Sequence, residues 1–130
     1  MLVVCTSLLM SPSLVVQGGI IRNRPDTIDR FMRAYARGIA RARSDREITY
    51  KSLAKYTRIE DPAVLAKAYD LYVGKVLEKA PYINMPGMKN ALDDLAATMP
   101  AAKAAKPEQF IDFRFLDKLE KNGLLKELYR

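Results

Sequence analysis

Two amphipathic helices follow one another between residues 24 and 56, and this succession constrains the fold more than any other feature of the chain. The first helix begins near Pro25, because proline suits the first helical turn, and Asp26 and Asp29 place negative charge at the positive end of the helix dipole. Its apolar residues recur every three or four positions and are expected to face a core: Ile28, Phe31, Met32, Tyr35, Ala36 and Ile39. The pattern therefore predicts a scaffold of packed helices.

Capping and proline signals mark the next two helices. Ser44 and Glu47 form a capping box, in which each side chain can bond a free backbone N–H of the helix that follows. Asp61 and Pro62 are an N-cap and a first-turn proline, and they open a helix that runs to about Lys79. The apolar residues expected to point inward are Ile48, Leu53 and Ala54 in the first helix and Val64, Leu65, Ala68, Tyr69, Tyr72, Val73 and Val76 in the second. The second face is so broad that its helix should be largely buried.

Proline and glycine divide the following stretch. A loop at residues 82–85 precedes a short helix over residues 88–97, which ends before Pro100. Residues 101–106 are small and basic, which is typical of an exposed connector.

A last helix is expected from Pro107 or Gln109 to Asn122, with Gly123 as the residue that ends it. The tail beyond it carries apolar side chains for docking: Leu124, Leu125 and Leu128. Some aromatic residues could line a pocket, but at helical spacing they pack in a core more often: Tyr69, Tyr72, Tyr82, Phe110, Phe113 and Phe115.

A different pattern precedes the helices. Leu14, Val15 and Val16 form a short apolar run bounded by turn residues, which predicts a buried strand. One strand cannot form a sheet, so its partner strands would lie elsewhere, in other sequence or in another chain. We therefore expect either self-association through this end or marked aggregation. The predicted fold class is mainly α, with about five helices after one short N-terminal strand.

One unit of typical domain size accounts for residues 13–130, and residues 1–12 form an atypical apolar start that we leave unassigned. The run from Met1 to Leu9 has no positively charged region before it and is too short to span a bilayer. This start therefore does not meet the requirements of a signal peptide.

The chain contains no histidine, no tryptophan and a single cysteine. Histidine is the commonest proton shuttle and metal ligand, and thiolate zinc sites and Cys–His nucleophiles need residues that the chain lacks. Glu60 with Asp61 and Asp93 with Asp94 are carboxylate pairs, but adjacent helical residues point about 100° apart. We predict no catalytic residues, no metal site and no cofactor, and hence a protein that is not an enzyme.

The net charge of +7 raises the question of nucleic-acid binding, which draws on clustered lysine and arginine. The basic residues are instead spread along the chain and mixed with acids such as Glu47 and Asp70. Four arginines form a stripe opposite the apolar face of the first long helix, without interleaved aromatic rings: Arg30, Arg33, Arg37 and Arg41. We predict that the stripe faces water and that no nucleic acid is bound, which ranks a basic nucleic-acid-binding module last.

Several segments carry a family resemblance through their order along the chain. The first is residues 22–39, which begin Arg-Asn-Arg-Pro-Asp-Thr-Ile-Asp-Arg-Phe. Leu-Ala-Lys-Tyr at 53–56, Asp61-Pro62, the predicted helix at 88–97 and the end of the connector at 104–108 follow. The last is Phe-Ile-Asp-Phe-Arg-Phe-Leu-Asp-Lys-Leu-Glu-Lys-Asn-Gly at 110–123. In this order they resemble the C-terminal third of bacterial ABC-transporter substrate-binding proteins of the nitrate, sulfonate and taurine type. The resemblance covers about residues 14–129.

The resemblance implies a type II periplasmic-binding fold, in which two α/β lobes close on a small ligand between them. The final third of such a protein adds a strand to the first lobe and covers that lobe with helices. The resemblance implies a fragment or truncated form of a periplasmic substrate-binding component of an ABC importer. The partners implied for the complete protein are a small, often anionic solute and a membrane permease. Ser11, Ser13 and the turn at Gln17 and Gly18 lie near the expected cleft, and the ligand-binding residues are unknown.

A second function from another class fits the same helices. A stand-alone helical interaction module would bind a partner through the apolar faces of residues 62–79 and 110–119. An importer component needs further α/β sequence to complete its lobes, whereas an interaction module does not.

Overall fold

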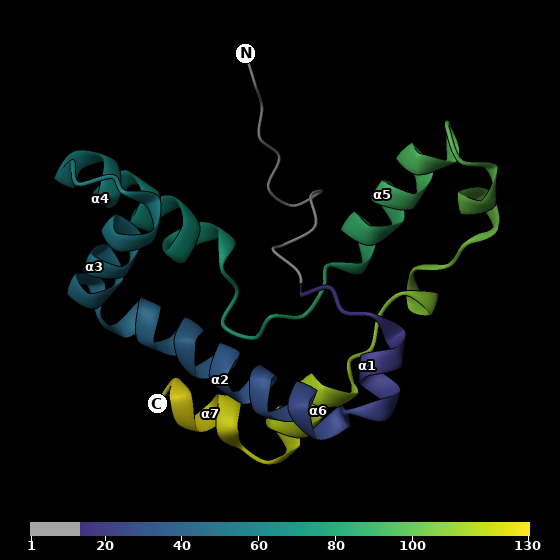
Figure 1. Ribbon diagram of the computed structural model, residues 1–130, viewed down its shortest axis with the longest axis horizontal. Helices are drawn as coiled ribbons and strands as arrows, with labels where there is room; N and C mark the ends of the chain where they lie inside the picture. Colours follow the sequence, from purple (N-terminus) through teal and green to yellow (C-terminus); the bar gives the residue numbers. More distant parts are fainter. Residues whose placement is uncertain (1–13) are drawn as a thin grey trace.

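The computed structural model describes residues 14–130, and every regular element in this range is helical (Figure 1). The mainly α class is therefore confirmed for these residues, while the unassigned start at 1–12 lies outside them. The α-helices are α1 (Gly18–Asn23), α2 (Pro25–Ser44), α3 (Arg46–Thr57), α4 (Pro62–Leu71), α5 (Met85–Ala96), α6 (Arg114–Lys121) and α7 (Leu124–Leu128). A π-helical turn, η1 (Tyr72–Val76), and two 3-10 turns, η2 (Pro100–Ala104) and η3 (Pro107–Gln109), complete the set.

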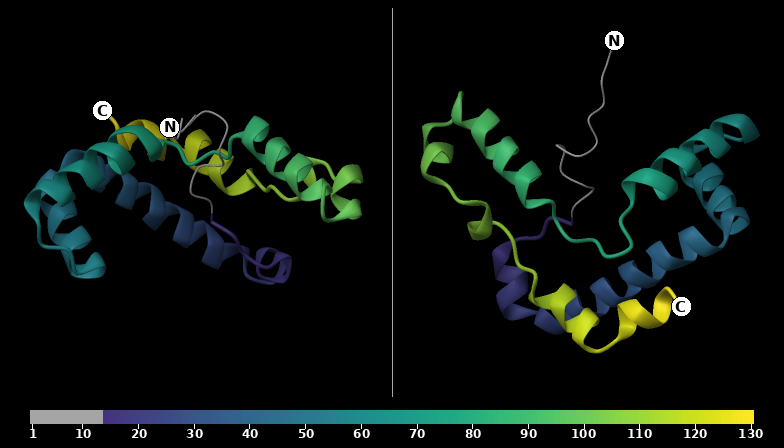
Figure 2. Two further views of the ribbon diagram at one scale, coloured as in Figure 1. Left: turned by 90° about the horizontal axis from the view of Figure 1, so that it is seen from above. Right: turned by 180° about the vertical axis from the view of Figure 1, so that it is seen from behind.

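Helix α2 is the long central element, and α6 and α7 lie along it to form a base. Helices α3 and α4 with η1 form one arm, and α5 with η2 and η3 forms the other (Figure 1). The two arms lie at opposite ends of the molecule in both further views (Figure 2). Among the described helical elements, α5 packs against η2 and η3 alone.

The hydrophobic core lies where α2 meets α6 and α7. Leu119 has no exposed surface and is the largest fully buried side chain in the described part. The chain reverses between α6 and α7 at Gly123, whose φ of 76° is one that glycine adopts without strain. This geometry confirms the expected helix end and the docking of the tail. The core residues are Ile28, Met32, Ala36, Leu116, Leu119 and Leu125.

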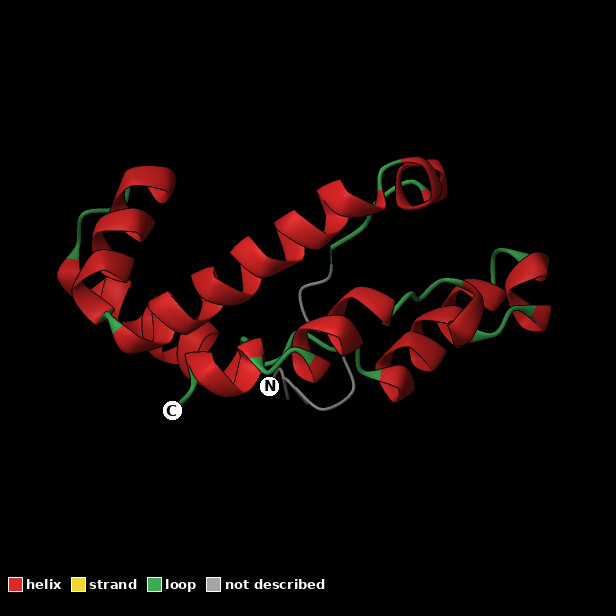
Figure 3. Cartoon of the chain, turned by 90° about the horizontal axis from the view of Figure 1, so that it is seen from below, coloured by secondary structure: helices red, strands yellow, loops and turns green. Residues whose placement is uncertain are grey.

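The prediction of a strand at residues 14–16 is wrong. These residues lie in an irregular segment before α1, and Figure 3 shows helices and loops without a strand in the described part of the chain. A strand is held by a ladder of hydrogen bonds to a neighbour, and no segment between residues 14 and 130 supplies one here. As a result Val15 keeps 87% of its surface exposed, whereas Val16 packs against the core.

Helix α2 begins at Pro25 as expected, and most of its apolar stripe is buried. Phe31 is an exception to the prediction, because 46% of its surface is exposed on the flank that α6 and α7 do not cover. The arginine stripe faces water at Arg30, Arg37 and Arg41. Arg33 is half-buried, and its Nε donates a hydrogen bond to an Asp29 oxygen at 3.3 Å.

The capping box predicted for α3 is wrong by one residue. Asp45, in an extended conformation, is the N-cap, and its carboxylate accepts a hydrogen bond from the Ile48 backbone N–H at 3.0 Å. Ser44 instead completes α2, where its hydroxyl donates to the Arg41 carbonyl at 3.3 Å. Aspartate caps a helix as well as serine does, so the shift costs nothing. Ile48, expected inside, is exposed in this register, and Leu53 is half-buried.

The helix opened by Asp61 is confirmed at its start, where the Asp61 carboxylate accepts from the backbone N–H of Ala63 at 2.8 Å. It is shorter than expected, because the backbone widens into η1 and ends at Val76. The prediction that it is largely buried is wrong, since it packs mainly on α3 in an arm that little else covers. Its buried residues are Leu65 and Val73, and its large exposed apolar residues are Val64, Leu71 and Tyr72.

The next helix, α5, begins earlier than expected. Asn84 caps it by accepting a hydrogen bond from the Gly87 N–H at 3.1 Å, so the turn at Met85 already belongs to the helix. The stretch expected to be an exposed connector forms η2, in which Ala102 is buried. Small alanine side chains let this turn pack closely on α5.

The last helix is interrupted, contrary to the prediction of one continuous helix. Residues 110–113 are not helical, and α6 begins only at Arg114. The Asp112 carboxylate accepts a hydrogen bond from the Arg114 N–H at 3.1 Å. Such a side-chain bond stabilises a turn in place of the helical backbone pattern.

Candidate functional site

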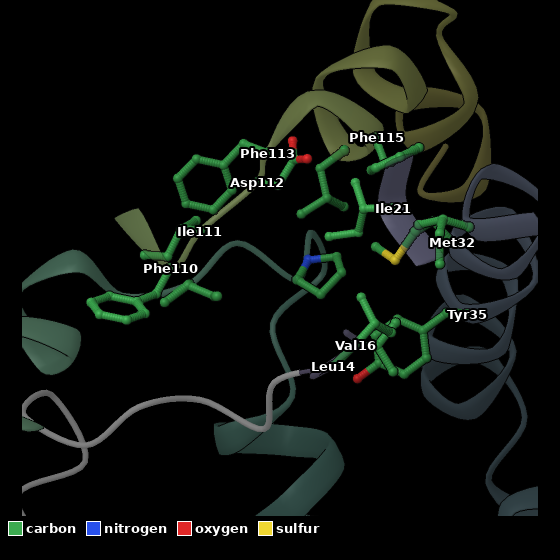
Figure 4. Close-up of a pocket in the computed structure, with 14 residues that line it drawn as sticks. Leu14, Val16, Ile21, Met32, Tyr35, Phe110, Ile111, Asp112, Phe113 and Phe115 are labelled. Atoms are coloured by element: carbon green, nitrogen blue, oxygen red, sulfur yellow. The ribbon is translucent and has the colours of Figure 1, made fainter. Parts of the chain in front are cut away.

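Three irregular segments, distant in sequence, converge on one side of the base. They are the start at 14–16, the link at 81–83 between the arms, and the stretch at 110–113 before α6. Together with α2 and α6 they enclose an apolar cavity of about 130 Å³, and Figure 4 shows Phe110 and Ile111 across from Met32 and Tyr35 of α2. We call this the apolar cavity. Its walls are Leu14, Val16, Ile21, Ile28, Met32, Tyr35, Pro81, Ile83, Phe110, Ile111, Asp112, Phe113, Phe115 and Leu116.

The one ionised side chain in the wall of the apolar cavity, Asp112, is already satisfied. Arg114 donates to both of its carboxylate oxygens, at 2.9 Å from Nε and 2.6 Å from Nη2. This guanidinium, together with the Arg114 backbone N–H, lowers the pKa of Asp112. A carboxylate held ionised by its own neighbour is a poor proton acceptor, and the remaining wall offers apolar contact rather than reaction chemistry.

A tyrosine beside the apolar cavity bridges the link between the arms and α6. Tyr82 donates hydrogen bonds toward Glu120 at 2.9 Å and Asp117 at 3.1 Å, and its ring packs edge-on against Phe113. Burial, and then the two carboxylates, raise the pKa of the Tyr82 phenol above its ordinary value of 10. The neutral phenol is therefore the form that the fold favours.

The raised pKa of Tyr82 predicts that the free energy of unfolding falls in alkali. Its folded-state pKa lies above its unfolded-state value, so its contribution is present below about pH 10 and is lost as the pH rises further. We expect Tyr82→Phe to make the fall in the free energy of unfolding between about pH 9 and 11 shallower, as measured by urea denaturation. The control is Tyr56→Phe, at an exposed position, which should leave the slope unchanged. Equal slopes in all three proteins would contradict the assignment.

The structure does not bring the predicted carboxylate pairs together into a site. Asp61 caps α4, and Asp93 forms an ion pair with Lys89 one turn away. Asp61 and Asp93 therefore have structural roles. No group of three or more potential metal-ligating side chains occurs within residues 14–130.

Only some of the residues that the resemblance places near a cleft fall within the described part of the chain. Ser11 and Ser13 lie outside the described residues. Gln17 precedes α1 without a capping side-chain hydrogen bond, and Gly18 begins that helix where a turn was expected. Gly18 borders an open depression beside Arg22 and Arg114, and none of these residues forms a closed binding site.

Comparisons with family models, with curated proteins and with solved structures find no match to this chain. Within the described range, no helix has the length and apolar character needed to cross a membrane.

Proposed function

We propose that this chain is the C-terminal part of a periplasmic substrate-binding component of an ABC importer, of the type II periplasmic-binding fold. The proposed solute is small and anionic, such as nitrate, a sulfonate or taurine, and the proposed partner is a membrane permease. The observation that supports this proposal is the apolar cavity, where three irregular segments meet over the helical base. A helical layer that covers a sheet has such an apolar face, and here the sheet would come from further polypeptide.

The side chains around the apolar cavity fit this role. Leu14 and Phe110 are large apolar residues that stay exposed at its edge, while Val16 and Phe113 are partly buried against the core. Strands that pack on a helical layer bury residues of this kind and gain about 25 cal/mol for each Å² of apolar surface removed from water. The proposed sheet therefore supplies the cover that the described residues do not.

Fragment complementation tests the proposal. We expect the chain alone to bind no nitrate, taurine or alkylsulfonate in calorimetry, because the cleft of a type II protein is built mainly by the rest of its two lobes. Co-expression with the N-terminal two-thirds of a substrate-binding protein of this type should give a copurifying complex. Saturable one-to-one binding by the chain alone at micromolar solute would contradict the proposal.

Two adjacent valines provide a matched pair of variants for this test. Val16 lines the apolar cavity, whereas Val15 is not among the lining residues and is exposed. Val16→Lys should abolish complex formation, because it buries a charge without a partner, and Val15→Lys should leave the complex intact. Failure of both variants, or success of both, would mean that the cavity is not where the remaining lobe packs.

A stand-alone interaction module is the second candidate function. It is favoured by a specific observation, since several large apolar side chains on the arm of α4 and η1 are exposed: Val64, Leu71 and Tyr72. A chain that stays monomeric and cooperatively folded at high concentration in light scattering would favour this module over the importer component and over self-association.

A further inference from the structure

A second apolar depression lies on a different flank of α2 from the hydrophobic core. Phe31, Tyr35 and Ile39 of α2 form one wall, and Leu77, just after η1, forms the other. The space between them is open and about 400 Å³ in volume, and almost all of its lining is apolar. We call it the α2 groove. Its remaining lining residues are Ala34 and Gly38.

The far wall of the α2 groove is held in place by a half-buried arginine. Arg43, on α2, donates hydrogen bonds from one guanidinium nitrogen to the carbonyls of Val73 and Leu77, both at 2.8 Å. Val73 lies within η1, and Leu77 follows it directly, where the backbone leaves the helical pattern. The clamp fixes Leu77 relative to Phe31, so the groove is preformed and a ligand would not need to order it.

The floor of the α2 groove leaves room for a ligand to approach the backbone of α2 closely. Ala34 and Gly38 are one helical turn apart, and beyond the neighbouring backbone of α2 no described atom lies within 4 Å of the place where a Cβ of Gly38 would be. With Phe31 at one end, the apolar strip from position 31 to 38 extends about 10 Å along the helix axis, or two turns. These dimensions suit an apolar helix face, whose ridges pack into such a groove.

The rim of the α2 groove is positively charged. Arg30, Arg37 and Arg41 are exposed along the side of α2 next to Ala34. Arg41 pairs with Asp45 at 2.7 Å, but Arg30 and Arg37 form no ion pair within residues 14–130. Two guanidinium groups beside an apolar strip complement a ligand that carries carboxylates beside apolar side chains.

We infer that the α2 groove binds an acidic amphipathic helix of a partner protein. Apolar residues at positions i, i+3 or i+4, and i+7 of that helix would fill the strip from Phe31 to Gly38, and flanking carboxylates would meet Arg30 and Arg37. A second copy of this chain is a poor occupant, because each copy carries a net charge of +7. The inference does not depend on the importer proposal, since the groove and the apolar cavity have only Tyr35 in common.

A synthetic helix tests the inference with the full chain. The probe is a fluorescein-labelled 18-residue peptide with leucine at every third or fourth position and glutamate beside each leucine. Fluorescence anisotropy should show saturable binding that weakens as salt is added. A peptide of the same pattern with lysine in place of glutamate should bind at least about tenfold more weakly, because its charges face Arg30 and Arg37.

Matched variants locate the site. Arg30→Glu with Arg37→Glu should weaken binding of the acidic peptide by about tenfold or more, and Phe31→Ala by about fivefold. Lys103→Glu with Lys106→Glu makes the same change in net charge on the arm of α5, η2 and η3. This pair should alter binding of the acidic peptide less than about twofold. All these positions are exposed, so the variants should fold, which circular dichroism checks.

Three results would overturn the inference. One is the absence of saturable binding by the acidic peptide, and a second is an equal loss of affinity in the Arg30/Arg37 and Lys103/Lys106 variants. A third is displacement of the peptide by an unrelated single-stranded oligonucleotide at equal concentration, which would identify a general polyanion surface that serves nucleic acid.

Discussion

Replacing Leu119 with Ala should lower the free energy of unfolding by about 2 to 5 kcal/mol, the range typical of fully buried leucines. Leu119 has no exposed surface and belongs to the core between α2 and the C-terminal helices. Truncation removes apolar contacts and leaves a cavity that Met32 and Leu116, fixed on two helices, can fill only in part. Urea denaturation monitored by circular dichroism measures the change.

The control for this prediction is Phe31→Ala, which removes a larger side chain from α2. Almost half of Phe31 is exposed, so its loss should cost only about 1 kcal/mol. Comparing the two variants therefore separates the effect of burial on stability from the effect of side-chain size. If they lost the same stability, α2 would have to be rotated relative to α6, and Phe31 would belong to the core.

Replacing Arg43 with Leu should destabilise the chain by about 2 to 3 kcal/mol. The substitution removes two charge-assisted hydrogen bonds and leaves the carbonyls of Val73 and Leu77 without their donor. Arg43→Lys should recover part of the loss, because an ammonium group can reach carbonyls but lacks the planar fork of arginine.

Arg37→Leu is the matched control for the Arg43 variant. It makes the same chemical change on the same helix at an exposed position, and should shift stability by no more than about 0.5 kcal/mol. Thermal unfolding of both variants compares them directly. Equal losses would mean that Arg43 does not join α2 to η1 and Leu77 in solution.

The helical part of this fold follows from local patterns. Pro25 begins α2, Asp61 caps α4, and Gly123 ends the turn before α7, because each residue favours its backbone geometry whatever surrounds it. The spacing of Ile28 and Met32 likewise identifies the buried face of α2. These features depend on residues only a few positions apart, so the sequence contains all that is needed to predict them.

Other features depend on competition between similar local choices. Ser44 and Asp45 are both good caps, and only the position of α3 decides between them. The side chain of Asp112 interrupts a helix that the apolar pattern alone would continue. The burial of Phe31 and Ile48 depends on which flanks of their helices other elements cover, and periodicity does not specify that.

The two apolar depressions could not be located from sequence. The apolar cavity joins Leu14, Ile83 and Phe110, which lie in irregular segments without a periodic pattern. The α2 groove needs Leu77 to face Phe31 across an open space, and the position of Leu77 follows from the π-helical turn and the Arg43 clamp. The one local signal was apolar residues next to proline in non-helical stretches, such as Pro81 before Ile83.

The separate packing of α5 implies that residues 14–130 form two cooperative units. Leu92 and Ala102 are buried in the arm that α5 forms with η2, and neither residue belongs to the core of the base. The arm can therefore open without breaking the contacts around Leu119, and its opening free energy is lower than that of global unfolding. Amide hydrogens of α5 would exchange with solvent through this partial opening, whereas those of α2 would exchange only through global unfolding.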